Sequence, residues 1–374
     1  MFPPSDSSLP QIESANLQVH AWVGLEGLRS QRAAWEKLLP IAAVDPLGND
    51  HDWVCAHAEA FAESKDIFGW TITDSGDRVV AIFPFRTEPK RGFFALTRAM
   101  ILQDGTFDSE YIDLLIRPGF ETLCLAHLLD ALSATRSVDV VLLMGVPDNS
   151  RSLHYLCPLL EERGLARRER PLEACVAQLP GSFEEFLKGL KSRMRSKVRA
   201  SIRKVNEAGG QITWSNNPET LPQDLDVLFD LHQMRWSEAG EPGSFADEKR
   251  RHFYRLLAPL CQRREMLALA KLELDGQVVA CQFGMIVDGS YYQVQEGYDP
   301  TFSNLRVGVA LRGMVIEQLI ERGVSAYDFM VGIGQHKTDW GAKPRPCTTL
   351  AFALPRWRAR LAYGLRAMLD RNRS

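Results

Sequence analysis

The feature that most constrains the fold of this chain is an order of elements that occurs twice. In the first half, residues 69–85 have the alternation and central turn of two strands joined as a hairpin. A helix follows, opened by Gly119 and running to about Leu132, and then a buried strand at Val138–Met144 that Gly145 stops.

The second half repeats that order. Residues 267–287 predict strand, turn and strand, residues 306–321 predict a helix opened by Gly308, and Tyr327–Val331 predicts a strand that Gly332 stops. The glycines correspond in pairs (Gly76 and Gly276, Gly119 and Gly308, Gly145 and Gly332) at spacings of 200, 189 and 187 residues. Self-similarity in this order indicates two copies of one α/β domain.

A length of 374 residues also suits two domains better than one core. We expect a disordered leader at 1–16, rich in Pro and Ser, and an N-terminal domain at 17–180 with a helix near Ser30–Leu39. A C-terminal domain at 181–355 and a basic C-terminal helix at 356–374 complete the expected organisation.

The composition excludes several classes of protein. A net charge of −3 argues against general binding to DNA, and no apolar stretch reaches the roughly 20 residues of a membrane span. Seven scattered cysteines without a CxxC pair indicate reduced thiols and a cytoplasmic location. We expect no bound metal, because there is no HExxH and no paired Cys/His set; GxSxG and P-loop motifs are also absent.

Residues 183–208 predict a helix with one apolar and one strongly basic face. Ser182 is the expected N-cap and Gly209 the expected stop. The polar face carries eight cations and no acid between residues 188 and 204 (Lys188, Lys191, Arg193, Arg195, Lys197, Arg199, Arg203, Lys204). This face is either an ordinary solvated surface or a site for anions such as cofactor phosphates, RNA or lipid.

The C-terminal stretch 356–374 holds six arginines and one acid, with Trp357, Leu361, Leu365 and Met368 at helical spacing. Such a segment suits peripheral contact with an anionic membrane or docking on the protein itself, and we favour self-docking.

Three short clusters contain residues suited to a ligand site. His232 and Arg235 stand three apart, hence on one helix face, with Trp236 beside them and Phe245 beyond a glycine-containing loop. The run from Tyr291 to Pro300 predicts a strand that parts from its neighbour at Gly297. The third cluster is a helix start where backbone amides can meet an anion (Arg306, Val307, Gly308, Val309).

The run Ala326–Val331 places one acid, Asp328, inside an apolar strand. A buried carboxylate is costly unless it is paired, and Lys337 and Arg345 are the candidate partners. Either such an ion pair is structural, or Asp328 belongs to a ligand site that Lys337 covers and of which Trp340 forms one wall.

Together these stretches resemble the GNAT-type acyltransferases of the CelD/BcsL group, which are related to the FemAB aminoacyltransferases. The matching residues are Leu231–Trp236 with Phe245, Glu296–Pro300, Gly308, and Tyr327–Gly332 with Lys337, Trp340 and Gly341. The resemblance covers about residues 180–350 and extends more loosely to the first half. It implies tandem GNAT-like domains of α/β (α+β) class, each a twisted mixed β-sheet flanked by helices.

The resemblance implies an enzyme that moves an acyl group from acetyl-CoA or another acyl-CoA to an amine or hydroxyl. The acceptor would be a small molecule or a saccharide of the cell envelope or an exopolysaccharide. The implied catalytic residues are Asp328, Lys337, His232 and Glu296; the donor would meet Gly297, Tyr298 and residues 306–309, and the acceptor Arg235, Trp236, Phe245 and Trp340. Two alternatives stay open: a FemAB-like transferase that uses aminoacyl-tRNA, and a non-catalytic scaffold in an envelope-polymer complex.

Overall fold

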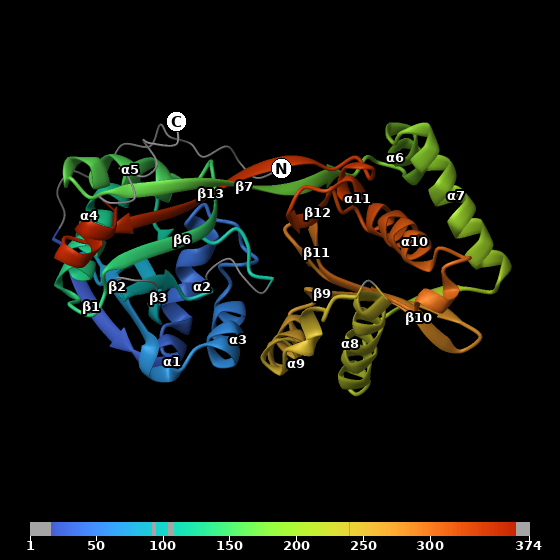
Figure 1. Ribbon diagram of the computed structural model, residues 1–374, viewed down its shortest axis with the longest axis horizontal. Coiled ribbons are helices and arrows are strands. Elements are labelled where there is room, and N and C mark those ends of the chain that lie inside the picture. The colour runs from blue at the N-terminus through green and yellow to red at the C-terminus, as the bar shows by residue number, and fades with distance from the viewer. Residues whose placement is uncertain (1–15, 92–94, 104–107, 239, 364–374) are drawn as a thin grey trace. The chain divides into compact units, whose positions relative to one another are not determined.

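The computed structural model describes residues 16–91, 95–103, 108–238 and 240–363 (Figure 1). Residues 1–15 of the predicted leader and residues 364–374 of the predicted C-terminal helix lie outside these residues. The chain divides into two compact units: unit 1 is residues 173–345, and unit 2 joins the residues before 173 to those from 346 onward. Residues 346–355, which the sequence analysis assigned to the C-terminal domain, are therefore part of unit 2.

Unit 1 is built on a mixed sheet in the order β7-β12-β11-β10-β9-β8. All neighbours are antiparallel except β11 and β12, which are parallel. Its elements are the end of β7 (Arg167–Gln178), α6 (Phe183–Gly189), α7 (Ser192–Glu207), β8 (Gln211–Trp214), α8 (Leu221–Glu238), α9 (Glu248–Arg263), β9 (Leu267–Leu274), β10 (Gln277–Val287), β11 (Ser290–Tyr298), α10 (Val307–Glu321), β12 (Ala326–Val331), α11 (Gln335–Thr338) and the start of β13 (Lys343–Ala353).

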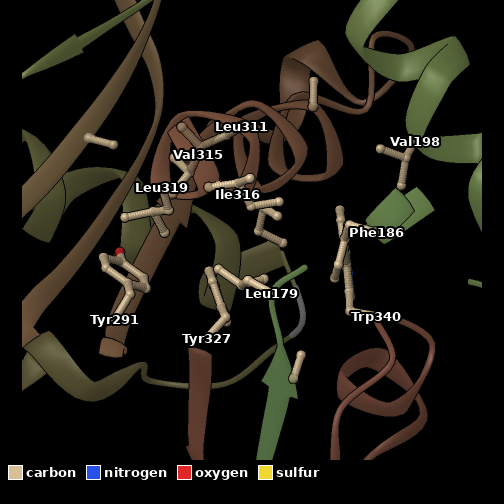
Figure 2. Packing of buried hydrophobic residues seen from close by; sticks show 14 of the residues in the cluster. Leu179, Phe186, Val198, Tyr291, Leu311, Val315, Ile316, Leu319, Tyr327 and Trp340 are labelled. Carbon is tan, nitrogen blue, oxygen red and sulfur yellow. The ribbon is translucent and has the colours of Figure 1, made fainter. Parts of the chain in front are cut away.

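Helix α10 covers one face of this sheet and lies beside α7, while α8 and α9 pack together on the other face (Figure 1). Figure 2 shows how Leu311, Val315 and Leu319 of α10 lie over the rings of Tyr291 and Tyr327. These side chains are buried, and the apolar stripe of α6 and α7 reaches the same cluster through Phe186 and Val198 among others. Burial of this surface is the main stabilising term for the unit.

Unit 2 has a mixed sheet in the order β1-β2-β3-β4-β6-β13, in which only β4 and β6 are parallel. The short β5 pairs with β3 beside this path. The elements are β1 (Gln18–Val23), α1 (Gly24–Arg29), α2 (Arg32–Leu38), α3 (His51–Phe61), β2 (Ile67–Thr73), β3 (Val79–Arg91), β4 (Leu96–Ile101), β5 (Leu115–Ile116), α4 (Glu121–Ala134), β6 (Val140–Pro147), α5 (Arg151–Glu162), the start of β7 and the end of β13.

The two units repeat one layout. In each, a hairpin (β2–β3 or β9–β10) is followed by a strand (β4 or β11), a helix (α4 or α10) and a strand (β6 or β12) that is parallel to the strand before the helix. A last strand then pairs antiparallel with β6 or β12. That last strand comes from the other half of the sequence: β7 pairs with β12 in unit 1, and β13 pairs with β6 in unit 2. The predicted α/β class and the duplicated mixed sheets flanked by helices are confirmed.

Three local predictions need correction. Strand β6 does not stop at Gly145 but continues to Pro147, because Gly145 forms a bulge with φ +68° within the strand. The basic helix is two helices, since Leu190 is extended and buried between α6 and α7, although Ser182 caps α6 as predicted. The helix expected near Ser30–Leu39 is α2, which begins at Arg32 and follows a separate α1.

Residues 357–363 of the C-terminal segment are helical and dock on unit 2. Ala359 is buried against Val140 and Ala353, with Tyr363 packed beside them. The favoured self-docking is therefore correct for the described part of this segment.

Candidate functional site

The strands β11 and β12 part inside unit 1. They are paired only at Ser290–Ala326, Tyr291–Tyr327 and Tyr292–Asp328. Beyond this point β11 follows β10 as far as Tyr298, with a register shift between Gly284 and Phe283 that leaves an extra residue in β11. The sheet thus has a fork between the two strands, as predicted, although it opens before Gly297.

Asp328 holds a bulge in β12 at the edge of this fork. Met330 has φ +62°, a left-handed conformation that is costly for a residue with a side chain. Its N–H donates to Asp328 Oδ1 over 2.7 Å, and Asp328 Oδ2 lies 3.6 Å from the guanidinium of Arg345. Asp328 is only 2% exposed. The acid in the apolar strand therefore fixes the backbone of the bulge, and Arg345, one of the two expected partners, balances its charge.

Lys337 stabilises the same bulge from the other side. Its Nζ donates to the carbonyl oxygens of Met330 and Val331, at 3.1 and 2.6 Å. This contact ties α11 to the end of β12. Lys337 thus has a structural role at the end of β12, through backbone carbonyl groups.

Glu296 is the centre of an ion cluster beside the fork. It accepts from Arg235 of α8 over 3.0 Å and from Arg312 of α10. Burial by itself raises the pKa of Glu296, but Arg312 and Arg235 outweigh burial and lower the pKa below its ordinary value. Glu296 is thus a stable carboxylate and a weak base.

Aromatic rings surround both arginines. Arg235 lies over the rings of Trp236 and Tyr298, at 5.6 and 5.3 Å from their centroids. Arg312 lies over Trp340 and Phe329, at 5.5 and 5.4 Å. Such cation–π contacts help to hold two positive charges beside a single carboxylate.

The start of α10 presents backbone N–H groups. Arg306 precedes the helix with φ +55°, its side chain makes no capping hydrogen bond, and the first turn contains no acid among the described residues. A Cβ added at Gly308 would lie 3.1 Å from the ring of Tyr298, so this glycine lets that ring pack against the helix start. An uncapped helix start with a neighbouring arginine attracts anions.

Other predicted site residues have packing roles. A Cβ at Gly297 would lie 2.4 Å from the backbone nitrogen of His232, so Gly297 lets α8 approach β11. His232 is buried and accepts from Trp236 Nε1 over 2.9 Å; burial, and then the charge of Arg235, lowers the pKa of His232 to about 4.

Two aromatic residues expected to meet the acceptor are inside the core. Phe245 is fully buried, and its ring lies 4.5 to 5.1 Å from those of Phe229, His232 and Tyr254. Trp340 is buried in the main apolar cluster (Figure 2). The structure thus gives Phe245 and Trp340 a role in packing, whereas Arg235 and Trp236 remain partly exposed.

The sequence analysis missed two residues near the fork. Arg312 is a lone cation in the otherwise apolar first half of α10, which is a signal for a paired, functional charge. His336 is exposed on α11, with its ring against Gly334. Partial burial, followed by the charges of Lys337 and Arg312, lowers the pKa of His336 below its ordinary value and so favours the neutral imidazole.

The corresponding places in unit 2 are filled. At the start of α4, Glu121 Oε2 accepts from the N–H of Gly119 over 2.7 Å, and Oε1 accepts from Arg151 over 2.5 Å. Between β4 and β5 the chain inserts a segment whose described residues include the buried Leu102, Tyr111 and Leu114. In the described residues, the helix start of unit 2 therefore has a carboxylate where the start of α10 has none.

Among the described residues, no group of three or more His, Cys, Asp or Glu side chains is arranged to hold a metal ion. Within the same residues, no helix is long and apolar enough to cross a membrane.

Residues 192–338, all within unit 1, match the model of the acetyltransferase (GNAT) domain. The chain matches none of the curated proteins with which it was compared. Unit 1 therefore contains a GNAT-type domain, the class of domain that its forked sheet and open helix start define.

Solved structures of low sequence identity share the fold. FemX is 11% identical, covers 89% of this chain and 98% of its own, and has a TM-score of 0.62. L-PGS from Bacillus licheniformis is 14% identical, with 90% and 95% covered and a TM-score of 0.53. The C-terminal domain of a putative lysylphosphatidylglycerol synthetase from Agrobacterium fabrum is 11% identical, with the same coverage and TM-score.

Proposed function

We propose that unit 1 transfers an acyl group from a CoA thioester to an amine, or to a hydroxyl, of an acceptor. The observation that carries this proposal is the contrast between two equivalent helix starts. The start of α10 has no carboxylate in its first turn, while the start of α4 has Glu121 bonded to the backbone. This contrast supports the start of α10, rather than that of α4, as the place for a phosphorylated donor.

The residues at the start of α10 fit such a donor. Its pyrophosphate would meet the N–H groups of Val307 and Gly308 and the guanidinium of Arg306, and Tyr298 would flank it. The N–H of Val309, which was also expected to meet the donor, instead donates to the carbonyl oxygen of Arg306 over 2.9 Å. The donor supplies an activated acyl carbon. The parted strands would take its extended arm, because the pairing of β11 with β12 ends at Tyr292 and Asp328.

We assign the proton-accepting role to His336. When the amine nitrogen forms its bond to the acyl carbon and the carbon–sulfur bond breaks, the nitrogen loses a proton and the sulfur gains one. A neutral, exposed imidazole can accept the first proton, whereas Asp328 is buried and already accepts the N–H of Met330. Asp328 and Lys337 act as positioning residues that shape the end of β12.

The acceptor class in this proposal follows from the resemblance to the CelD/BcsL group: a small molecule or a saccharide of the cell envelope. The partly exposed Arg235 and Trp236, beside the fork, are the residues that we expect it to contact.

A FemAB-like transfer from aminoacyl-tRNA is the second candidate, and one observation favours it. Seven of the eight cations between residues 188 and 204 are exposed, and ion pairs within 4.0 Å are seen for Lys191, Arg199 and Arg203. Lys204 donates to the carbonyl of Asn304, just before α10. A basic helix that ends beside the donor site suits RNA phosphates.

The two donors, and the scaffold alternative, are separated by one set of measurements on the intact protein. Acetyl-CoA at a hundredfold its Kd should raise stability by about 2.7 kcal/mol, visible as a rise in melting temperature. Filter binding with aminoacyl-tRNA serves as the second arm. A melting shift with CoA esters, and none with a phosphate-free control such as pantetheine, supports our proposal. Retention of tRNA without a CoA shift supports the FemAB-like function, and no response to either leaves a scaffold.

A further inference from the structure

A pocket on unit 2 combines an apolar floor with a rim of arginines. It has a volume of about 300 Å³ and lies on the sheet face opposite α4 and α5. Strands β4, β6 and β13 supply Leu96, Val140, Leu142, Met144 and Ala351 to its floor. The C-terminal helical residues Ala362 and Tyr363 also line it.

Three arginines line the same pocket, and no acidic residue among the described ones does. They are Arg98 of β4 with Arg168 and Arg170 of β7. Glu88, which lies opposite Arg98 in the sheet, pairs with Arg86 at 3.6 Å. Arg168 is held over the ring of Tyr363, 5.4 Å from its centroid. The pocket thus joins positive charge to apolar surface, the combination that suits an anionic amphiphile.

The helical segment beside the pocket has a second apolar face, which is exposed. While Ala359 is buried against the sheet, Trp357 is 69% exposed and Leu361, one turn later, is 49% exposed. Arg358 and Arg360 lie between them in the sequence and are exposed as well. Exposed Trp and Leu flanked by arginines form the pattern of a helix that lies in a membrane interface.

We propose that unit 2 docks on an anionic membrane, with an acidic phospholipid head group in this pocket and with Trp357 and Leu361 in the interface. Charge complementarity selects this occupant. The chain's own residues 364–374 carry three arginines and one acid, so the arginine rim repels them on balance. This inference does not depend on the proposed acyl transfer.

The test is co-sedimentation of the full chain with vesicles of phosphatidylcholine alone or with about 30% phosphatidylglycerol. We expect binding only to the anionic vesicles, and its loss at high salt. The double variant Arg98→Gln/Arg170→Gln should bind about thirtyfold more weakly, since each arginine near such a surface contributes about 1 kcal/mol. Trp357→Ser/Leu361→Ser should also weaken binding.

Two controls keep the result specific. Arg263→Gln removes an exposed charge at the end of α9 in unit 1 and should leave binding unchanged. All variants should melt like the wild type. Equal binding of wild type and the double arginine variant, or no preference for anionic vesicles, would overturn the proposal.

Two further arms separate other occupants. A soluble short-chain phosphatidylglycerol below its micelle concentration should raise the melting temperature only slightly; a large shift without vesicle binding would show a site for free amphiphile and contradict membrane docking. Removal of residues 364–374 should not strengthen vesicle binding. If it does, the tail is the pocket's own occupant and the proposal is wrong.

Discussion

The two units share one layout but differ in the residues that adopt a left-handed conformation at two places in it. Near the helix start this residue is Gly119, two residues before α4, in unit 2, and Arg306, immediately before α10, in unit 1. The left-handed residue of the strand bulge is Gly145 in unit 2 and Met330 in unit 1. At these two places unit 2 has glycine, for which the conformation is free of strain, and unit 1 has residues with side chains.

This difference accompanies a second one, between a helix start that holds a carboxylate and one that does not. In unit 2 Glu121 accepts the N–H of Gly119 at the helix start, and the described side chains Leu102, Tyr111 and Leu114 after β4 are buried. In unit 1 the strained residues stand on either side of the fork, and Asp328 and Lys337 hold one of them in place. Retained strain of this kind is expected at a working site.

The largest expected effect tests the buried ion pairs of the two units. Arg312→Met leaves Glu296 with only Arg235, and Arg151→Met deprives Glu121 of its arginine; each should cost about 3–5 kcal/mol of unfolding free energy. Denaturant titration measures the loss. Only Arg312→Met should also weaken binding of acetyl-CoA. A parallel loss in Arg151→Met would remove the functional distinction between the units.

Next in size is the loss of transfer in His336→Gln. We expect a fall of about a hundredfold in kcat, without a change in melting temperature, because the residue is exposed. Asp328→Asn should lower both activity and melting temperature, since it loses the charge that faces Arg345 beside the bulge. Steady-state kinetics with thermal melts checks both. Full turnover in His336→Gln would refute its role.

The pH dependence of stability should have opposite signs in the two units. The folded pKa of His232, about 4, is below its unfolded value near 6.5, so its contribution is present above pH 6.5 and lost as the pH falls toward 4. Burial raises the pKa of Asp113 in unit 2 to about 6, against the hydrogen bonds of Ser150 and Ser152. Its contribution is present below pH 4 and lost as the pH rises through 6.

Denaturant titrations between pH 4 and 7 separate these two groups. Relative to the wild type, His232→Gln should lose less stability on acidification, and Asp113→Asn should lose less as the pH rises from 4 to 6. Each difference should be on the order of 2 kcal/mol. If the unfolding free energy of each variant changed with pH as that of the wild type does, neither His232 nor Asp113 would titrate as its burial requires.

The smallest expected effect concerns the strained helix start. Arg306→Gly should stabilise the protein by up to about 1 kcal/mol, and Gly119→Ala should destabilise it by a similar amount. We also expect acetyl-CoA to bind several-fold more weakly to Arg306→Gly, a cost that Gly119→Ala should not show. Isothermal titration and melting curves measure the two quantities.

The sequence predicted those parts of the fold whose signals are local. The hairpins, the helix openings at Gly119 and Gly308 and the cap at Ser182 depend on residues close in the chain, and they are where they were expected. The sequence did not predict that β7 would pair with β12 and β13 with β6, each in the other half of the chain. No local pattern in these two strands names their partners, which tertiary packing selects.

The site was less predictable for a similar reason. Asp328 and Arg345 were named as partners, but the bulge at Met330 that their contact stabilises has no sequence signature. Phe245 and Trp340 match the family pattern, but both side chains are buried and pack in the core. Arg312 was overlooked because its partner Glu296 is on another element.

The most direct test of the central claim is to place a carboxylate at the start of α10, as Glu121 is placed at the start of α4 in unit 2. Val309→Glu places a carboxylate in the first turn, where it favours the helix but repels phosphate, and Val309→Gln is its neutral match. Isothermal titration with acetyl-CoA should show binding to Val309→Gln and none to Val309→Glu, with similar melting temperatures. Equal affinities for the two variants would contradict a donor site at this helix start.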